Sequence, residues 1–209
     1  MNEYYVPASD ACAEFIERKS RFIGTIWRVE TEEEALAHIK EMNEKHRDAT
    51  HNVYAYIIKE NNIMRYSDNG EPQGTAGMPT LEVLRREGIT NVLCVVTRYF
   101  GGILLGAGGL VRAYAHSAKI ALDAAGVSVM RQWTQMLLEA PYNWQERVKL
   151  RTEEKGGIIE GTEFGASVLF DICVPSETVE EFTADIIDFT NGIVSPIPMG
   201  DKFMGVRIR

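Results

Sequence analysis

The spacing of apolar and polar residues in the first part of the chain alternates between strand-like and helix-like patterns. Two runs rich in β-branched and aromatic residues, 12–20 and 21–29, predict neighbouring strands. Residues 31–47 carry apolar side chains at helical spacing, and Thr31 and Glu34 are placed as a capping box at the helix start. This part of the chain is therefore expected to form a strand pair followed by an amphipathic helix.

The same alternation continues through the middle of the chain. It predicts a hairpin, a short helix, a buried strand and a long helix at residues 52–68, 80–87, 91–100 and 108–125. Loops dense in glycine precede both helices, at residues 68–79 and 101–109. Loops that connect strands to helices converge at one edge of an α/β sheet, so we expect these two loops to lie together.

The second half of the chain has a different rhythm, in which six elements follow one another as β-α-β-β-α-β. The predicted elements are strand 134–140, helix 141–155, strands 157–164 and 166–175, helix 176–192 and strand 193–200. This order is the split βαβ, or ferredoxin-like, pattern. Residues 127–133 are interpreted as a connector, with a short strand inside it as the alternative. The sequence thus predicts an α+β protein with two domains, 1–130 and 131–209.

Composition narrows the class of protein. The 209-residue chain is 45% hydrophobic and carries a formal net charge of −8. The hydrophobic share is that of an ordinary globular protein, and the acidic balance argues against nonspecific coating of duplex DNA. No apolar run approaches the roughly 18 residues of a membrane span, and the first residues lack a secretory pattern. We expect a cytoplasmic protein that does not bind membranes.

The three cysteines, Cys12, Cys94 and Cys173, lie far apart in the sequence. Their number is odd and no pair has the spacing of a zinc site. Reduced thiols are the expected state, because disulfides are rare in cytosolic proteins. No metal site is expected.

The glycine-rich stretch between the two arginines Arg98 and Arg112 fits neither of two nucleotide-binding motifs. A G-x-G-x-x-G fingerprint ends at Val111 where the last glycine belongs, and a P-loop has Ala107 where lysine is required. We therefore expect no NAD or Walker-type ATP site and no other cofactor.

The physics behind those motifs still applies to this stretch. A helix N-terminus after glycines presents free N–H groups to an anion, and arginines such as Arg98 and Arg112 supply forked donors. The candidate anion- or partner-binding glycines are Gly101, Gly102, Gly106, Gly108 and Gly109. The alternative is that these glycines only permit positive φ and close packing.

The first glycine-rich loop carries two carboxylates, Asp68 and Glu71. Paired carboxylates can perform acid–base work or hold a hard cation, so both residues are catalytic candidates. The alternative is turn chemistry, because Asp-Asn-Gly is a turn sequence in which Asp68 bonds its own backbone. Thr75 and Gly77 of the same stretch are further candidates for binding an anion or a partner.

Three further polar residues complete the candidate set. His51 begins a predicted strand and is the third catalytic candidate, although a lone histidine is more often structural. Lys19 and Arg21 add positive charge near the predicted turn between the first two strands, where a solvated turn also explains them.

Four segments, "KSRFIG", "HNVYAYII", "SDNGEPQGTAG" and "VVTRYFGGILLGAGGLVRAY", occur in this order across residues 19–114. Together they strongly resemble the YigZ/IMPACT family, whose most specific motif is R-Y-F-G-G-x-x-L-G-x-G-G-L-x-R-A-Y. The C-terminal half resembles the second domain of bacterial YigZ-type members.

This resemblance implies a fold for each half. It implies an N-terminal ribosomal-protein-S5 domain-2-like α/β domain and a C-terminal ferredoxin-like βαββαβ domain similar to the last domain of elongation factor G. It also implies a link to translation. Eukaryotic members regulate translation initiation by competing for an activator of a stress kinase. They carry an additional N-terminal RWD domain, for which we expect no room before residue 19.

Three hypotheses for function follow. The first is a regulatory or interaction protein linked to translation, which binds RNA, a ribosomal component or another protein through a Gly/Arg-rich surface. The second is an enzyme acting on a phosphorylated or otherwise anionic small molecule, with Asp68 or Glu71 as acid or base and Arg98 and Arg112 as clamps. The third is a pair of structural domains. A deep pocket enclosing these residues would favour the enzyme, and a flat basic groove would favour nucleic acid.

Overall fold

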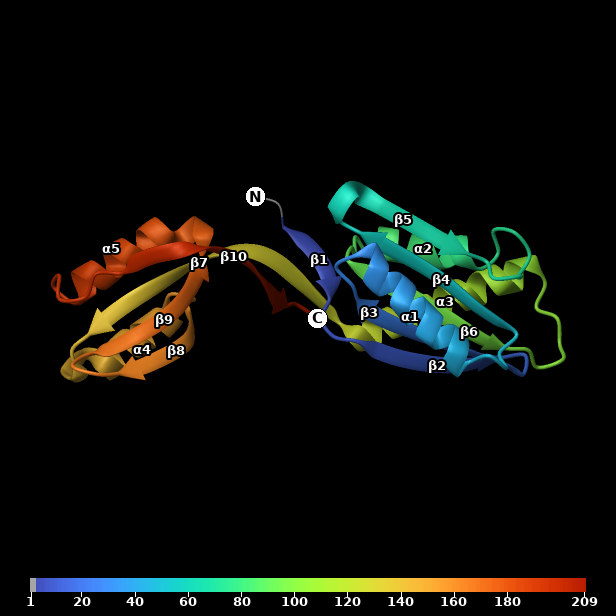
Figure 1. The fold of residues 1–209 in the computed structure, drawn as a ribbon, viewed down its shortest axis with the longest axis horizontal. Helices are drawn as coiled ribbons and strands as arrows, with labels where there is room; N and C mark the ends of the chain where they lie inside the picture. The colour runs from blue at the N-terminus through green and yellow to red at the C-terminus, as the bar shows by residue number, and fades with distance from the viewer. Residues whose placement is uncertain (1–2) are drawn as a thin grey trace. The chain divides into compact units, whose positions relative to one another are not determined.

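The computed structural model describes residues 3–209. The chain forms two compact units: a larger one of residues 4–129 and 205–209, and a smaller one of residue 3 with 130–204 (Figure 1). The domain boundary expected at residue 131 stays a prediction. The candidate residues of the sequence analysis all lie in the larger unit.

The larger unit is built on a five-stranded sheet with the order β2-β3-β6-β4-β5, in which all neighbours are antiparallel. The strands are β2 (Ala11–Glu17), β3 (Ser20–Arg28), β4 (His51–Ile58), β5 (Ile63–Ser67) and β6 (Val92–Tyr99). A short 3-10 turn, η1 (Glu60–Asn62), joins β4 to β5. β6 is central and buried up to Arg98, as its unbroken apolar run predicts for a strand covered on both faces.

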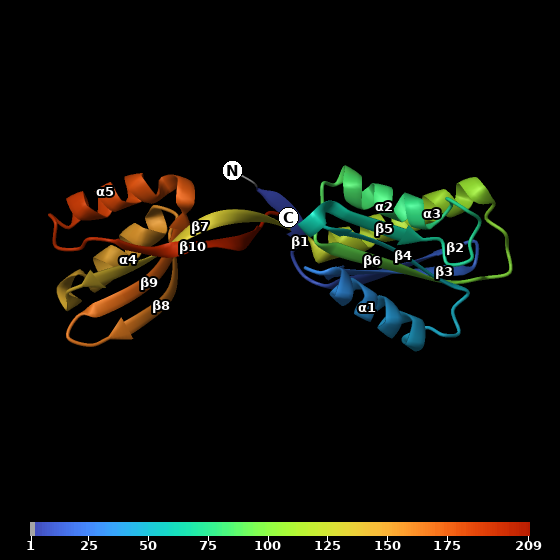
Figure 2. The same cartoon turned by 45° about the horizontal axis from the view of Figure 1, so that its top comes forward.

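Helices cover both faces of this sheet (Figure 2). α1 (Glu32–Lys45) packs on one face, and α2 (Gly77–Arg86) and α3 (Ala107–Ala125) pack on the other. The buried alanines of α3 let this helix approach the sheet closely. A Cβ at Gly24 of β3 would lie only 2.6 Å from the carbonyl oxygen of Ser117. This close packing fixes the position of α3 on β3.

The smaller unit has the β-α-β-β-α-β order expected from the sequence. Its elements are β7 (Val127–Ala140), α4 (Gln145–Glu154), β8 (Ile158–Phe164), β9 (Val168–Pro175), α5 (Val179–Phe189) and β10 (Ile197–Arg207). Short 3-10 turns, η2 (Tyr142–Trp144) and η3 (Ser176–Thr178), precede the two helices. β10 pairs with β7, followed by β9 and β8, and β1 (Tyr4–Pro7) also pairs with β7. The α+β class with two sheets is thus confirmed.

Two segments of this part differ from the sequence expectation. Residues 127–133, interpreted as a connector, form the first half of β7, because Val127 and Val129 are buried and the strand continues without a break. The last strand, expected at 193–200, starts at Ile197. The residues before it form a turn in which the Thr190 hydroxyl accepts a hydrogen bond from the backbone N–H of Val194.

The start of α2 also differs from the expected position, because the helix begins at Gly77 rather than at Thr80. The N–H groups of Ala76 and Gly77 donate to the carboxylate of Asp68 at 3.1 and 2.8 Å. This carboxylate lies eight and nine residues before the two N–H groups that it binds, a separation that no capping pattern in the sequence reveals. None of the helices formed by residues 3–209 combines the length and the apolar character needed to cross a bilayer.

Candidate functional site

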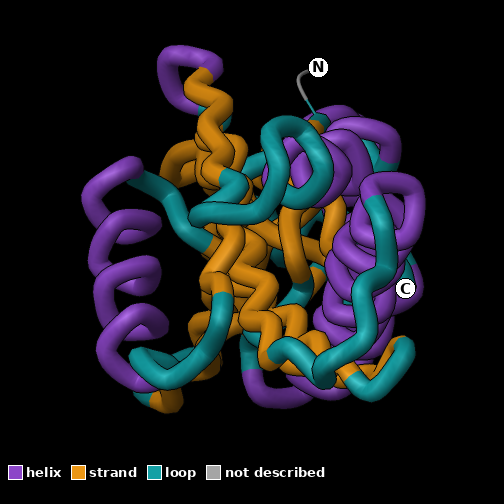
Figure 3. Tube along the Cα trace, turned by 90° about the vertical axis from the view of Figure 1, so that its right-hand side faces the viewer, coloured by secondary structure: helices purple, strands orange, loops and turns teal. Residues whose placement is uncertain are grey.

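The two glycine-rich loops meet at one end of the larger unit, which faces the viewer in Figure 3. Between them is a cavity of about 370 Å³, which we call the Arg98 cavity. Its apolar walls come from Pro72, Phe100, Leu104, Leu105 and Leu110, and its polar lining from Thr50, His51, Glu71 and Arg98. The start of α3 adds Gly106 and Ala107. The expected convergence of the two loops is confirmed.

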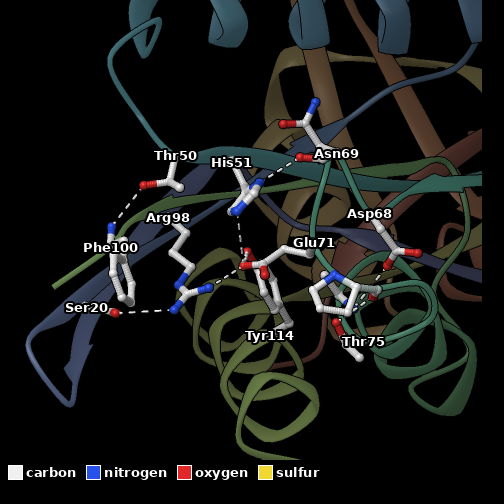
Figure 4. Close-up of polar contacts among 12 residues, drawn as sticks. Ser20, Thr50, His51, Asp68, Asn69, Glu71, Thr75, Arg98, Phe100 and Tyr114 are labelled. Atoms are coloured by element: carbon white, nitrogen blue, oxygen red, sulfur yellow. Dashed lines mark hydrogen bonds and ion pairs between the residues drawn. The ribbon is translucent and has the colours of Figure 1, made fainter. Parts of the chain in front are cut away.

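A buried ion pair lies in the polar lining of this cavity. Nη1 of Arg98, at the end of β6, donates to Oε1 of Glu71 at 2.5 Å, and the two residues are only 5% and 8% exposed (Figure 4). The hydroxyl of Tyr114, from α3, donates to the same oxygen at 2.7 Å. Burial, together with the negative charge of Glu71, raises the pKa of Tyr114, so this hydroxyl stays a donor.

His51, the first residue of β4, completes the polar lining. Its Nδ1 donates to the carbonyl oxygen of Asn69 at 2.7 Å, and its Nε2 lies 3.8 Å from Oε1 of Glu71. The hydrogen bond at Nδ1 fixes the ring and leaves Nε2 as an acceptor in the neutral form. The side chains of His51, Glu71 and Arg98 thus enter the cavity from β4, from the first glycine-rich loop and from β6.

The other groups around the Arg98 guanidinium are partly aromatic. The rings of Phe22 and Phe100 lie with their centroids 5.4 Å from its central carbon, and Nη2 donates to the Ser20 hydroxyl at 3.4 Å. Nε of Arg98 is buried and has no hydrogen-bond partner within residues 3–209. The guanidinium is therefore held in place by one carboxylate, one hydroxyl and two rings.

Asp68 has a different role in the structure. Its Oδ2 accepts from the N–H of Gly74 at 2.8 Å, while Oδ1 accepts from the two N–H groups at the start of α2. The neighbouring Thr75 hydroxyl donates to the carbonyl oxygen of Pro72 at 2.7 Å. Asp68 and Thr75 hold the loop that carries Glu71, and neither lines the Arg98 cavity.

The glycines of the second loop have three different roles in the structure. A Cβ at Gly101 would overlap the backbone of Lys19, and one at Gly109 would lie 2.9 Å from Cβ of Leu105, so these two glycines allow close packing. Gly102 and Gly106 have positive φ values of 84° and 72°, and Gly106 is the N-cap of α3. A Cβ at Gly108 would lie 3.6 Å from Nη1 of Arg112, an ordinary contact distance, so packing does not require a glycine at this position.

A second cavity, of about 280 Å³, lies on the other side of Leu105. It is lined by the charged or ionisable residues Glu17, Arg18, Arg112 and His116, with Phe15, Leu105, Gly109 and Ala113. Arg112 thus lies in this cavity rather than with Arg98, so the two arginines of the motif do not converge on one point.

The cations around this second cavity have few partners. Arg18, Lys19 and Arg112 are exposed, and none forms an ion pair with any residue in the described part of the chain. We call these three residues the basic rim. Nη1 of Arg18 donates to the carbonyl oxygen of Leu104 at 3.3 Å, which ties the rim to the second loop. Arg21, in contrast, is paired with Glu14 at 2.5 Å.

Sequence reasoning missed several residues of this region: Arg18, Ser20, Thr50, Tyr114 and His116. One signal was available for Tyr114, which follows Leu110 by four residues and therefore shares its helix face. The others required the fold. Within residues 3–209 no group of three or more His, Cys, Asp or Glu side chains is placed to hold a metal ion.

Comparisons with known proteins place the chain in a family. The Impact N-terminal domain matches residues 18–122, and a domain of unknown function (DUF1949) matches residues 138–192. The IMPACT family member YvyE of Bacillus subtilis is 37% identical over 193 residues, covering 92% of this chain and 89% of the relative. The IMPACT family member YigZ of Escherichia coli is 32% identical over 195 residues, covering 92% and 96%.

A solved structure described as a hypothetical protein is also similar. It has a TM-score of 0.60 and 31% sequence identity, over 95% of this chain and 98% of the other. The chain belongs to the IMPACT family, the family that the sequence analysis connects with the regulation of translation.

Proposed function

We propose that the protein is a regulatory or interaction protein of translation, acting in the cytoplasm, which binds the phosphate backbone of a single-stranded RNA through its basic rim. The observation that carries this proposal is the set of three exposed cations, Arg18, Lys19 and Arg112, without ion pairs in a chain of net charge −8. They lie beside the first turn of α3, whose free N–H groups favour an anion.

The backbone of the turn that carries two of these cations supports the proposal. Arg18 and Lys19 form the two-residue turn between β2 and β3, with φ values of 45° and 66°. A turn of this kind usually carries Asn-Gly or Asp-Gly, because other residues are strained at positive φ. Strain of this kind clusters at functional sites. Two long cations in place of Asn-Gly favour a role in binding.

Arg98 is less suited to hold a phosphate. Its charge is compensated by Glu71 at 2.5 Å, and a phosphate at the guanidinium would lie near that carboxylate. The sequence predicted that Arg98 and Arg112 bind an anion together. We now propose this role for Arg112 with the β2–β3 turn instead.

Salt dependence gives a quantitative test. Each phosphate contact on single-stranded nucleic acid contributes about −0.7 to the slope of log K against log salt, so three contacts give roughly −2. Affinity should then fall roughly 20-fold between 50 and 200 mM salt. The measurement is fluorescence anisotropy with a labelled 12-nucleotide RNA.

Variants of the rim complete the test. Arg18→Gln and Arg112→Gln should each weaken binding and reduce the slope by about 0.7. Arg86→Gln is the matched control, because Arg86 is exposed on α2 and does not line either cavity. If the parent, the rim variants and the control all bind the RNA with the same affinity, the proposal is contradicted.

The Arg98 cavity favours a second candidate, an enzyme acting on a phosphorylated or otherwise anionic small molecule. His51 Nε2 beside the Glu71 carboxylate is a candidate acid–base pair. Asp68, expected in this role, has both carboxylate oxygens bonded to backbone N–H groups. This candidate is tested by assaying turnover of phosphorylated small molecules. The parent should turn one of them over, and a folded His51→Ala variant should not.

A further inference from the structure

We propose that the Arg98 cavity receives one unstacked base of the bound RNA strand, with guanine preferred. This inference rests on the proposed function and names the part of the RNA that is read. The cavity adjoins the basic rim, because Leu105 lines both cavities and Arg18 bonds the carbonyl oxygen of Leu104. A strand with phosphates on the rim thus has a cavity for a base beside it.

The cavity has the size and the walls that a base needs. Its volume of about 370 Å³ lies in the usual range for sites that enclose a small molecule. Phe100 is 44% exposed, lines the cavity, and lies at its entrance with Leu104, which is 79% exposed. An exposed aromatic ring stacks with any base, and single-stranded RNA is commonly held in this way.

The polar lining selects among the bases. Oε1 of Glu71 takes the contacts from Arg98 and Tyr114, and within residues 3–209 its Oε2 accepts no hydrogen bond (Figure 4). Nε2 of His51, an acceptor in the neutral ring, lies 3.8 Å from Oε1. When the His51 ring is neutral, the cavity offers two neighbouring acceptors, Oε2 of Glu71 and Nε2 of His51.

Guanine is the base whose Watson–Crick edge matches two neighbouring acceptors. Its N1–H and its 2-amino group are adjacent donors, whereas adenine, cytosine and uracil each present a single donor there together with acceptors. A buried site built to receive hydrogen bonds rejects ligands that lack the donors, because its acceptors then stay unpaired.

An apolar peptide side chain fits this cavity less well than a base does. A leucine or phenylalanine anchor would fill the apolar walls but bring no donor to Glu71 and His51. Their hydration would be lost without replacement, which is unfavourable for buried polar groups. The polar lining thus favours a base over an apolar anchor from a protein.

The test uses the full chain and labelled heptaribonucleotides of sequence UUUXUUU, where X is guanosine, inosine, adenosine, cytidine or uridine. Inosine is the matched ligand control, since it lacks only the 2-amino group of guanosine. We expect the guanosine oligomer to bind about tenfold more tightly than the uridine oligomer, and the inosine oligomer to lose much of this preference.

Two variants test the residues of the cavity. Phe100→Ala should weaken the binding of all five oligomers about tenfold, because stacking on the ring is lost. His51→Ala should remove the preference for guanosine, so that this variant binds the guanosine and uridine oligomers with similar affinities. Thermal melting checks that both variants are folded, and the inosine comparison on the parent needs no variant.

The possible failures are distinguishable. Equal affinity for all five oligomers, with the salt slope and the rim dependence intact, would overturn the base-reading proposal and leave the proposed function standing. No salt-dependent binding of any oligomer would overturn both. Displacement of RNA by an acidic peptide with leucine anchors, abolished by Phe100→Ala, would assign the cavity to a protein and also overturn the proposal.

Discussion

Replacing Glu71 with leucine removes the buried carboxylate that lies 2.5 Å from the guanidinium of Arg98. Breaking a buried pair in this way costs about 3–5 kcal/mol, because the remaining charge is buried without a counterion. The cavity beside Arg98, at about 370 Å³, is large enough to hold water near the remaining charge, so we expect the lower value of about 3 kcal/mol. The hydrogen bond from Tyr114 is lost as well, which makes this figure a minimum.

Thermal and urea unfolding at pH 7 measure the effect. A loss of 1 kcal/mol lowers the Tm of a chain of this size by roughly 2–4 °C, so Glu71→Leu should lower it by roughly 6–12 °C. The control is Glu82→Gln, which breaks the exposed pair between Glu82 and Arg85. Exposed pairs contribute at most about 1 kcal/mol, so its Tm should stay close to that of the parent.

The double variant Arg98→Met/Glu71→Leu tests the reasoning itself. Replacing both buried charges with apolar groups is often neutral, so the double variant should be more stable than Glu71→Leu alone. If the losses of unfolding free energy in Arg98→Met and Glu71→Leu simply add up in the double variant, the two charges are not coupled and the ion-pair account is refuted.

Three further predictions concern packing and titration. A thiol reagent at pH 8 should modify Cys12 in the folded protein but not Cys94, since burial raises the pKa of Cys94 to about 12. Gly101→Ala should destabilise by about 1–3 kcal/mol in urea unfolding, because its Cβ would overlap the β2–β3 turn. Arg151 holds the pKa of Asp185 below its usual range. The stability from Asp185 is therefore present at pH 7 and lost as pH falls below about 4, so Asp185→Asn should lower the Tm at pH 7 but not at pH 2.

Local patterns predicted most elements of the larger unit, because their signals lie within a few residues of one another. Thr31 is the N-cap of α1, and its hydroxyl accepts from the N–H of Glu34 as the capping box predicts. The carboxylate of Glu34 departs from that pattern and accepts from the N–H of Glu30. The start of α2 was missed because its stabilising group, Asp68, is distant in sequence.

The candidate site could be predicted only in part for a similar reason. The glycines and arginines lie at the end of the larger unit that holds both cavities, and Glu71, His51 and Arg98 do share one cavity. Their relation is set by the pairing of β4 with β6, where His51 lies opposite Arg98. The sequence does not show that Glu71 neutralises Arg98, since 27 residues separate them and a loop joins their elements.

Because Arg112 lies in the basic rim and Phe100 lines the Arg98 cavity, we expect these two side chains to affect different steps of the proposed RNA binding. Arg112 is exposed in the basic rim, and rim charges act mainly on the association rate and its salt dependence. Phe100 lines the Arg98 cavity, where contacts form only after the strand has docked, so its loss should raise the dissociation rate. Stopped-flow measurements with the guanosine oligomer should show slower association for Arg112→Gln and faster dissociation for Phe100→Ala. A Phe100→Ala variant that changes only the association rate would show that the ring takes part in the first encounter, and the base would then not enter the cavity.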